Sequence, residues 1–263
     1  MARPIVALLS DFGSRDHYAG TMKGVILGIC PDVTLVDISH EIPPHDMQLA
    51  ALELAAACRF FPRGSIFLSV VDPGVGSVRR GIAAQAGQHR FVAPDNGVLT
   101  VVFQDNPPNE VVELTERRYA RPTVSRTFEG RDRFAPAAAW LAKGIQLSAL
   151  GRPVSGYTTL EIPRIEISDG AIEGLVLRVD RFGNLVTNIY RRAFDRLAKL
   201  GGIDISVGGH SVERLVETYA EIGDDEVCAL FGSTDHLEIA VNTDSAVERL
   251  GIKEGAVVQV SRR

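Results

Sequence analysis

A carboxylate and two guanidinium groups follow one short apolar segment of the sequence. Residues 66–71 are mostly apolar and include β-branched side chains, and after them come Asp72, a glycine-rich turn, and Arg79 and Arg80. Such a run, bounded by a turn, predicts a strand that is buried on both faces. Because ligands of open α/β sheets bind beyond the carboxyl ends of the strands, the sequence predicts a site here. The alternative is a solvated loop whose arginines pair with surface acids.

Polar side chains also follow two other predicted strands. Asp11 comes directly after residues 5–10, and Asn96 lies shortly after residues 90–93. In a mostly parallel sheet, both side chains would meet Asp72 at one edge. A carboxylate in that position can accept two hydrogen bonds from the hydroxyl groups of a ribose.

In the second half of the chain, Phe182 and Asn184 lie close together in a predicted hairpin that begins near Asp180. Phe182 could stack on a nucleobase, and the amide of Asn184 could pair with an edge of adenine. The alternative is an ordinary β-turn with Phe182 in the core. A second turn and strand, residues 232–242, is dense in polar groups.

Common cofactor and metal motifs are absent from the sequence. It has no Gly-x-Gly-x-x-Gly fingerprint and no Gly-Lys-Ser/Thr motif, so neither a Rossmann cofactor nor phosphoryl transfer is predicted. His40 and His45 share one loop but have no identifiable third ligand, and the three cysteines have no Cys-x-x-Cys spacing. We therefore expect no cofactor and no metal.

The order of the predicted elements indicates two domains. Strands alternate with helices over residues 1–155, which predicts an α/β domain with a central, mostly parallel sheet. Its elements include a predicted strand over residues 98–103 and a predicted helix over residues 134–143. Residues 156–263 hold short strands between regular turn signals, which predicts a small C-terminal antiparallel β-barrel domain.

The composition is that of an ordinary globular protein. Of the 263 residues, 45% are hydrophobic and 23% charged, and the net charge of −5 gives no basis for non-specific nucleic-acid binding. No segment approaches the roughly 20 apolar residues of a membrane span, and no signal-peptide cleavage site follows the first apolar run. The scattered cysteines indicate buried thiols, so we expect a cytoplasmic protein.

Six segments together carry a resemblance to a known family: LLSDFGSRDHYAGTMKGVI, SVVDPGVGSVRR, FVAPDNGVLT, TFEGRDRFAPAAAWLA, VDRFGNLVTNI and residues 233–242. In order and spacing they resemble the S-adenosyl-L-methionine hydroxide adenosyltransferases, hydrolases of S-adenosylmethionine that are related to fluorinase and chlorinase. The resemblance implies an α/β domain, a small β-barrel, and a homotrimer with active sites between subunits. It also implies that S-adenosylmethionine reacts with water to give adenosine and methionine, without a metal.

The resemblance implies roles for individual residues as well. Asp11 would hold the ribose hydroxyls, Phe182 and Asn184 would receive the adenine, and Asp180 and Ser233 would hold the methionine end. The full substrate-binding set that it implies is Asp11, Asn96, Phe128, Asp180, Phe182, Asn184, Ser233, Glu238 and, through its backbone, Val241.

Catalytic roles are implied for Asp72, Arg79 and Glu129. The first two match members of an Asp-Arg-His set with which the hydrolases handle water. The halogenases have a tyrosine where Asp72 stands, which favours hydrolysis over halide transfer. Glu129 stands where these hydrolases have histidine, and a carboxylate there is a candidate general base for water. The alternative is that Glu129 faces solvent or pairs with Arg131 or Arg133.

Two other functions stay open on the sequence. One is halide-dependent synthesis of 5′-halo-5′-deoxyadenosine, which Asp72 disfavours. The other is binding of S-adenosylmethionine or adenosine without catalysis, which the change from histidine to Glu129 makes more plausible.

Overall fold

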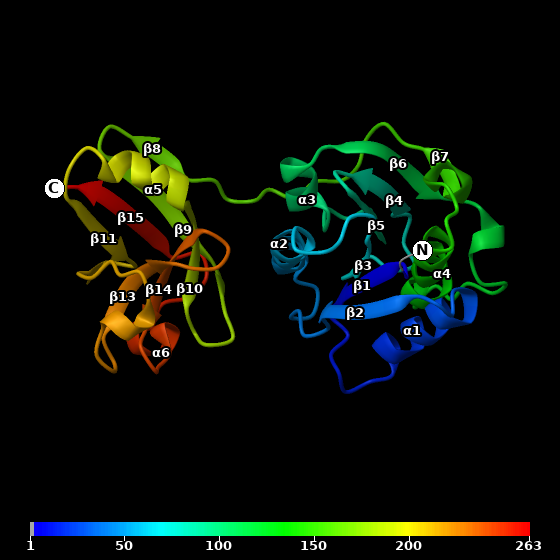
Figure 1. Cartoon of the computed structure of the whole chain (residues 1–263), viewed down its shortest axis with the longest axis horizontal. Coiled ribbons are helices and arrows are strands. Elements are labelled where there is room, and N and C mark those ends of the chain that lie inside the picture. The colour runs from blue at the N-terminus through cyan, green and yellow to red at the C-terminus, as the bar shows by residue number, and fades with distance from the viewer. Residues whose placement is uncertain (1–2) are drawn as a thin grey trace. The chain divides into compact units, whose positions relative to one another are not determined.

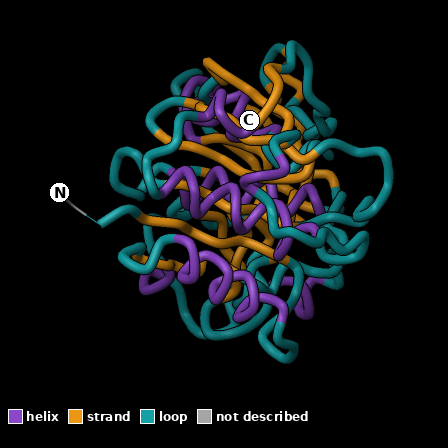
Figure 2. Tube along the Cα trace, turned by 90° about the vertical axis from the view of Figure 1, so that its right-hand side faces the viewer, coloured by secondary structure: helices purple, strands orange, loops and turns teal. Residues whose placement is uncertain are grey.

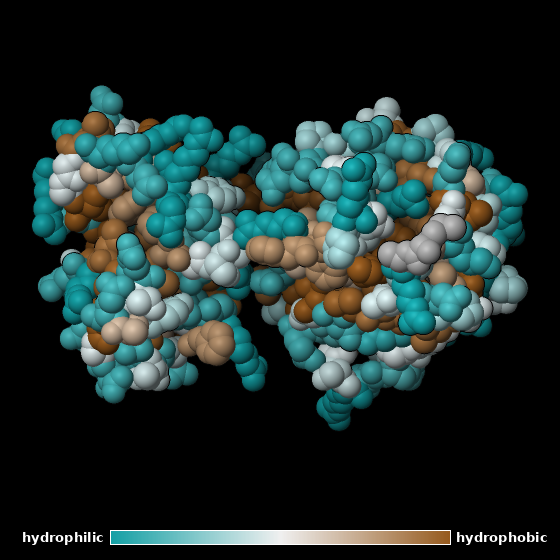
Figure 3. Space-filling view, in the orientation of Figure 1, coloured by the Kyte–Doolittle hydropathy of each residue, from teal (hydrophilic) through white to brown (hydrophobic). Residues whose placement is uncertain are grey.

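The computed structural model describes residues 3–263, which form two compact units (Figure 1). The first unit ends at Glu161 and the second begins at Ile162. Figure 2 shows their strands in orange, helices in purple and connecting loops in teal. On the face drawn in Figure 3, polar residues surround smaller apolar patches. Among the described residues, no helix combines the length and the apolar character that crossing a membrane requires.

The sheet of the first unit has seven strands. In spatial order they are β2 (Thr34–Ser39), β1 (Ile5–Ser10), β3 (Ile66–Val70), β5 (His89–Pro94), β4 (Gly81–Ala86), β6 (Pro108–Leu114) and β7 (Gly151–Pro153). The pairings among β2, β1, β3 and β5 are parallel, whereas those of β4, β6 and β7 are antiparallel.

The sheet is therefore mixed, and the expectation of a mostly parallel sheet is wrong for the strands beyond β5. Only Gly87 and Gln88 join β4 to β5. A connection of two residues closes a hairpin, whereas a parallel pair needs a crossover of a dozen residues or more.

Helices cover both faces of this sheet. Helices α1 (Tyr18–Ile29) and α4 (Ala135–Ala142) pack on one face, and α2 (Met47–Cys58) and α3 (Thr100–Asp105) pack on the other (Figure 1). Side chains of β3 alternate between the two cores, with Leu68 on the side of α1 and Phe67 on the side of α2. All five residues of β3 are buried, which confirms the predicted strand with two buried faces.

The predicted strand over residues 98–103 is wrong, because this segment forms a turn and most of helix α3. Its valines suit a strand, but its buried apolar side chains repeat at helical spacing, at residues 98, 99, 102 and 103. Packing against α2 therefore overrides the local β-propensity. The predicted helix over residues 134–143 is confirmed as α4, which follows a π-helical turn at Gly130–Phe134.

The second unit is one antiparallel sheet that nearly closes on itself. Its strands, in spatial order, are β12 (His210–Val212), β11 (Ile203–Val207), β15 (Val257–Arg262), β9 (Ala171–Val179), β10 (Leu185–Tyr190), β14 (His236–Val241) and β13 (Val227–Phe231), and β8 (Glu166–Ser168) pairs with β9. A bridge from Leu215, just after β12, to Ala229 in β13 connects the two edges. Helices α5 (Arg191–Ala198) and α6 (Ala246–Leu250) complete the unit, and the predicted antiparallel, barrel-like character is confirmed.

Candidate active site

A pocket of about 320 Å³ opens in the first unit at the carboxyl ends of β1 and β3. It is lined by four of the residues singled out from the sequence: Asp11, Asp72, Phe128 and Glu129. Parallel pairing of β1 with β3 brings the two aspartates to the same edge of the sheet. The ring of Tyr18 also lines this pocket and packs edge-to-face on Phe128, with ring centres 5.1 Å apart.

The carboxylate of Asp11 is held by the loop that precedes α2. The backbone N–H of His45 donates a hydrogen bond of 2.9 Å to Oδ2 of Asp11, and the aspartate side chain is only 10% exposed. Among residues 3–263 no hydrogen bond to Oδ1 is formed. This oxygen therefore retains its capacity to accept from a ligand hydroxyl.

A chain of hydrogen bonds lies behind Asp11 and fixes the end of β1. His40 bridges Ser10 Oγ, at 2.7 Å from Nδ1, and Asp37 Oδ1, at 3.0 Å from Nε2. Lys23 donates to the other oxygen of Asp37. Ser10 is fully buried, so this Ser-His-Asp order positions the loop instead of presenting a nucleophile. Burial raises the pKa of Asp37, but the hydrogen bonds and charges of Lys23 and His40 outweigh it and lower that pKa.

Alternating charges form a cluster beside the first pocket. Nε of Arg79 donates to Oδ1 of Asp72 over 2.8 Å, and Nη2 donates both to Oδ2 of Asp72 and to Oε2 of Glu129. The three side chains are at most 12% exposed. Burial lowers the pKa of Arg79, but its bonds to the two carboxylates outweigh this and raise that pKa above its ordinary value. Arg79 is therefore a permanent cation held between two acids.

Glu129 also contacts a second guanidinium, which sequence reasoning did not place in the site. Arg133 Nη1 donates to Oε1 of Glu129 over 2.9 Å, while Arg131 pairs with the buried Asp132. The two interpretations of Glu129, as an active-site residue and as a partner of a neighbouring arginine, each agree in part with the structure. Glu129 lines the pocket beside Arg79 and also pairs with Arg133. The spacing of four residues between Glu129 and Arg133 is the sequence signal that indicates this pair.

Asn96 does not line either of the two pockets described here. Its Nδ2 donates to the carbonyl of Val71 over 2.8 Å, and its Oδ1 accepts from the N–H of Val98. The side chain therefore links the end of β3 to the turn before α3. A substrate contact of Asn96 stays a prediction.

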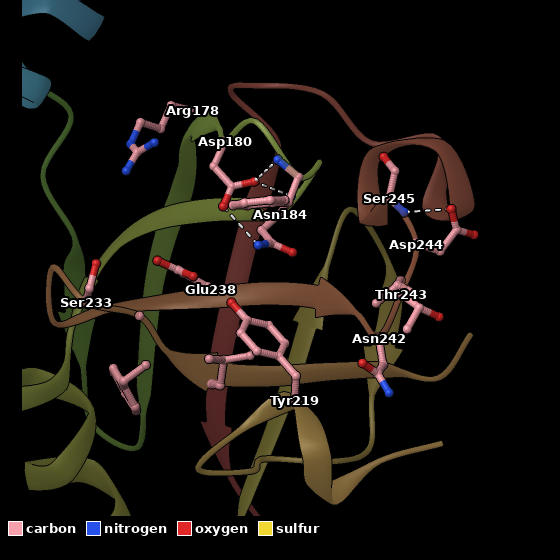
Figure 4. A pocket seen from close by; sticks show the side chains of 15 residues that line it. Arg178, Asp180, Asn184, Tyr219, Ser233, Glu238, Asn242, Thr243, Asp244 and Ser245 are labelled. Carbon is pink, nitrogen blue, oxygen red and sulfur yellow. Dashed lines mark hydrogen bonds between the residues drawn. The ribbon is translucent and has the colours of Figure 1, made fainter. Parts of the chain in front are cut away.

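A larger pocket of about 940 Å³ lies in the second unit (Figure 4). It is lined by every residue singled out from this half of the chain: Asp180, Phe182, Asn184, Ser233, Glu238 and Val241. Sequence reasoning missed Arg178 and Tyr219, which line the same space. Tyr219 belongs to a short 3₁₀ turn, Tyr219–Glu221, that no local pattern connects to the hairpin.

Asp180 fixes the hairpin that carries Phe182 and Asn184. Its Oδ1 accepts from the backbone N–H groups of both residues, and its Oδ2 accepts from Nδ2 of Asn184 over 2.9 Å (Figure 4). Phe182 is 77% exposed, so the alternative that places this ring in the core is wrong. Gly183 takes the positive φ of 85° that the turn needs, and the phenylalanine is left to face the pocket.

Acidic groups give the second pocket its electrostatic character. Glu238 is 7% exposed, and burial raises the pKa of its carboxyl, with a further contribution from the charge of Asp180. Burial also raises the pKa of Tyr219, whose hydroxyl points toward Glu238 in Figure 4. Arg178 partly offsets these acids. A ligand with positive charge would relieve the repulsion between the two carboxylates.

Neither pocket is built like a metal site. Within the part of the chain that the structure describes, no group of three or more His, Cys, Asp or Glu side chains could hold a metal ion. Two carboxylates of the first pocket, Asp72 and Glu129, are instead paired with arginines, and Asp11 accepts from the backbone N–H of His45. The donors and acceptors there suit a polar organic ligand and a water molecule.

Comparison with known proteins gives the same family for both units. The model of the SAM hydroxide adenosyltransferase N-terminal domain matches residues 6–151, and that of the C-terminal domain matches residues 174–259. The (R)-S-adenosyl-L-methionine hydrolase of Thermus thermophilus is 40% identical over 98% of this chain and 99% of its own. The fluorinase of Nocardia brasiliensis is 29% identical over 98% of this chain and 97% of its own.

A solved structure supports the same relationship. An uncharacterized conserved protein from Thermotoga maritima matches the fold with a TM-score of 0.91 at 35% identity, covering 98% of this chain and 100% of that protein. The sequence matches along nearly its whole length, and the fold matches as well. The chain therefore belongs to the SAM hydroxide adenosyltransferase family.

Proposed function

We propose that this protein hydrolyses S-adenosyl-L-methionine to adenosine and L-methionine. The observation that carries the proposal is the 40% identity, along 98% of the chain, to the (R)-S-adenosyl-L-methionine hydrolase of Thermus thermophilus. The fluorinase of Nocardia brasiliensis is more distant, at 29% identity. Because the Thermus enzyme is named for the (R) form, we propose that the (R) epimer at the sulfonium is the preferred substrate.

In the proposed reaction, the oxygen of water forms a bond to C5′ of the ribose while the bond from C5′ to sulfur breaks. The electron pair of that bond stays on sulfur, so methionine leaves as a neutral thioether and the water gives up one proton. An attacking hydroxide-like oxygen and a sulfonium cancel each other's charge, so a pocket of low dielectric favours the transition state. Orientation of the two reactants contributes on the order of 7–11 kcal/mol in favourable cases.

The charge cluster supplies groups for handling the water. Asp72 and Glu129 both line the first pocket, and we assign uptake of the proton to Glu129 and orientation of the water to Asp72. Arg79 uses four of its five N–H groups on these two acids and on the carbonyl of Arg80. Its task in this proposal is therefore to hold the two carboxylates that face the water.

The substrate contacts divide between the two pockets. Asp11 accepts hydrogen bonds from the ribose hydroxyls in the first pocket, where Phe128 also lies. In the second pocket, the exposed ring of Phe182 stacks on the adenine, and Asn184 pairs with its edge. The remaining contacts of that pocket are assigned to Asp180 and Ser233 at the methionine end, and to Glu238 and the backbone of Val241 around the nucleoside.

One assay separates the proposed activity from its competitors. Purified protein is incubated with the two epimers of S-adenosylmethionine, with and without chloride or fluoride, and the nucleosides are separated by chromatography. We expect adenosine in all cases, faster from the (R) epimer and independent of halide. A 5′-halo-5′-deoxyadenosine that appears only with halide would indicate a synthase, and bound but unchanged substrate would indicate a binding protein.

We further propose that the protein is a cytoplasmic homotrimer, in which the first pocket of one subunit and the second pocket of its neighbour form one site. Each pocket is lined by residues of a single unit, so each holds only part of the predicted contacts. Helix α1 also leaves a face open, because Cβ atoms added at Gly20, Gly24 or Gly28 would meet nothing within 4 Å. The three cysteines are free and buried, as expected of thiols in a reducing compartment.

The assembly is tested by light scattering coupled to size-exclusion chromatography, with activity measured across the same peak. We expect a mass of three chains and activity only in that peak, because a monomer would lack half of the proposed contacts. A monomer that releases adenosine at the full rate would overturn the shared site.

A further inference from the structure

Two arginine side chains bind Glu129, one at each carboxylate oxygen. Among the described residues, no other carboxylate of the first pocket is bound by two arginines. Arg79 binds Oε2, and Arg133 donates to Oε1 over 2.9 Å. Arg133 is itself anchored, because its Nη2 donates to the carbonyl of Leu114 at the end of β6 over 2.7 Å. Its side chain is 24% exposed, and that of Glu129 is 12% exposed. This geometry differs from that of a solvated surface ion pair, which contributes little.

The backbone around this pair is unusual. Residues Gly130–Phe134 form a π-helical turn, in which the N–H of Ala135 bonds to the carbonyl of Gly130. Glu129 directly precedes the turn and Arg133 lies within it. Turns of this kind interrupt α-helices and are frequent at functional sites. Here the turn places an acid that lines the pocket and a partner arginine on the same segment.

The number of charges in the cluster explains why the second arginine matters. Asp72 and Glu129 beside Arg79 alone would leave one uncompensated negative charge in a nearly buried place, which favours protonation of one acid. With Arg133 the cluster has two acids and two guanidiniums. The other titratable side chains that line the pocket come from different elements: Asp11 after β1, Tyr18 on α1 and His45 before α2.

We propose that Arg133 is a positioning residue of this active site, which holds Glu129 in place beside Arg79 and balances the negative charge of the two carboxylates. The inference rests on the proposed hydrolysis and assigns to it a residue outside the Asp72, Arg79 and Glu129 set. Arg133 does not line the pocket, so it acts on the reaction only through Glu129.

The test compares Arg133→Met, which removes the charge at similar length, with Arg133→Lys, which keeps a charge. Release of adenosine from S-adenosylmethionine is measured for each over about pH 4 to 9. In Arg133→Met we expect the acidic limb of the pH–rate profile to move to higher pH by about one unit, because the loss of a cation makes protonation of the cluster easier. Turnover on that limb then falls about tenfold, and it changes much less on the alkaline side. In Arg133→Lys the limb stays near its parental position.

Two further comparisons separate this role from a purely structural one. Arg121→Met is the matched control, since Arg121 also pairs with a buried acid of the π-helical turn, Asp132, but does not contact Glu129. It is expected to leave the limb in place. In a Glu129→Gln background, Arg133→Met should not shift the acidic limb. Urea unfolding gives a second test that needs no activity: the changes in midpoint of Glu129→Gln and Arg133→Met, measured singly and together against the parent, should be non-additive.

The outcomes are distinct for the two proposals. A parent protein that releases no adenosine overturns the proposed hydrolysis, and with it the catalytic part of this inference. A parent that is active, with an Arg133→Met variant whose limb and turnover are unchanged, overturns the inference alone. Additive urea midpoints would show that Arg133 and Glu129 are not coupled, which also contradicts it.

Discussion

Glu129→Gln is expected to lower the turnover of S-adenosylmethionine by about 10²-fold or more, the usual range for the loss of a general base. Both oxygens of Glu129 accept hydrogen bonds from guanidiniums, one from Arg79 and one from Arg133. Glutamine has only one oxygen, so its NH₂ group would face one of these cations. The substitution therefore removes the proton acceptor and also disturbs the cluster that holds it.

Glu129→His tests the role of Glu129 as a base by replacing it with a different base. Imidazole is protonated near pH 6.5, whereas an ordinary glutamic acid is protonated near pH 4.3. A base works only while unprotonated, so activity is lost as the pH falls through its pKa. We expect this variant to retain substantial activity, with an acidic limb that lies at higher pH than in the parent.

The measurement is single-turnover and steady-state release of adenosine, accompanied by calorimetric binding of adenosine. Glu116→Gln is the control, because Glu116 pairs with Arg118 on the exposed surface and lines neither pocket. Adenosine affinity should be little changed in both glutamine variants. If Glu129→Gln hydrolyses at the parental rate over about pH 6 to 9, Glu129 is a bystander and Asp72 with Arg79 handles the water alone.

The parts of this site that can be predicted from the sequence are those formed by residues close together in the chain. Asp11 follows one buried strand and Asp72 follows another, and the geometry of parallel strands brings both to one edge. The hairpin from Asp180 to Asn184 is likewise local, since its turn, its glycine and its capping aspartate lie within five residues. In such segments, the side chains that follow an element are positioned by that element.

The parts that the sequence does not predict depend on partners far along the chain. The segment over residues 98–103 has the composition of a strand, and only its packing against α2 makes it helical. The first sheet becomes mixed because β5 turns back beside β4 to lie between β3 and β4, and the later strand β6 pairs with the other side of β4, an order that composition does not specify. Arg133 belongs to the same class, because its anchor on Leu114 is nineteen residues away.

Asp11→Ala is expected to weaken the binding of adenosine by about 10²-fold to 10⁴-fold. A hydrogen bond to a charged acceptor contributes about 1.5–3 kcal/mol, and the ribose offers two hydroxyls. In the structure, Oδ2 of Asp11 accepts from His45 N–H, and Oδ1 has no partner among the described residues. Both oxygens therefore have acceptor capacity left for a diol, although one of them already fixes the loop.

Calorimetric titration with adenosine measures the effect, and light scattering checks that the assembly is unchanged. Asp11→Asn is the matched variant, because its amide oxygen can still accept from His45 and only the charge and one acceptor are lost. It should lose less affinity than Asp11→Ala while keeping the loop in place. Two variants that bind adenosine as tightly as the parent would remove Asp11 from the ribose site. A loss in Asp11→Ala that Asp11→Asn restores in full would assign to Asp11 only the support of the loop at His45, since an uncharged amide would then serve as well as the carboxylate.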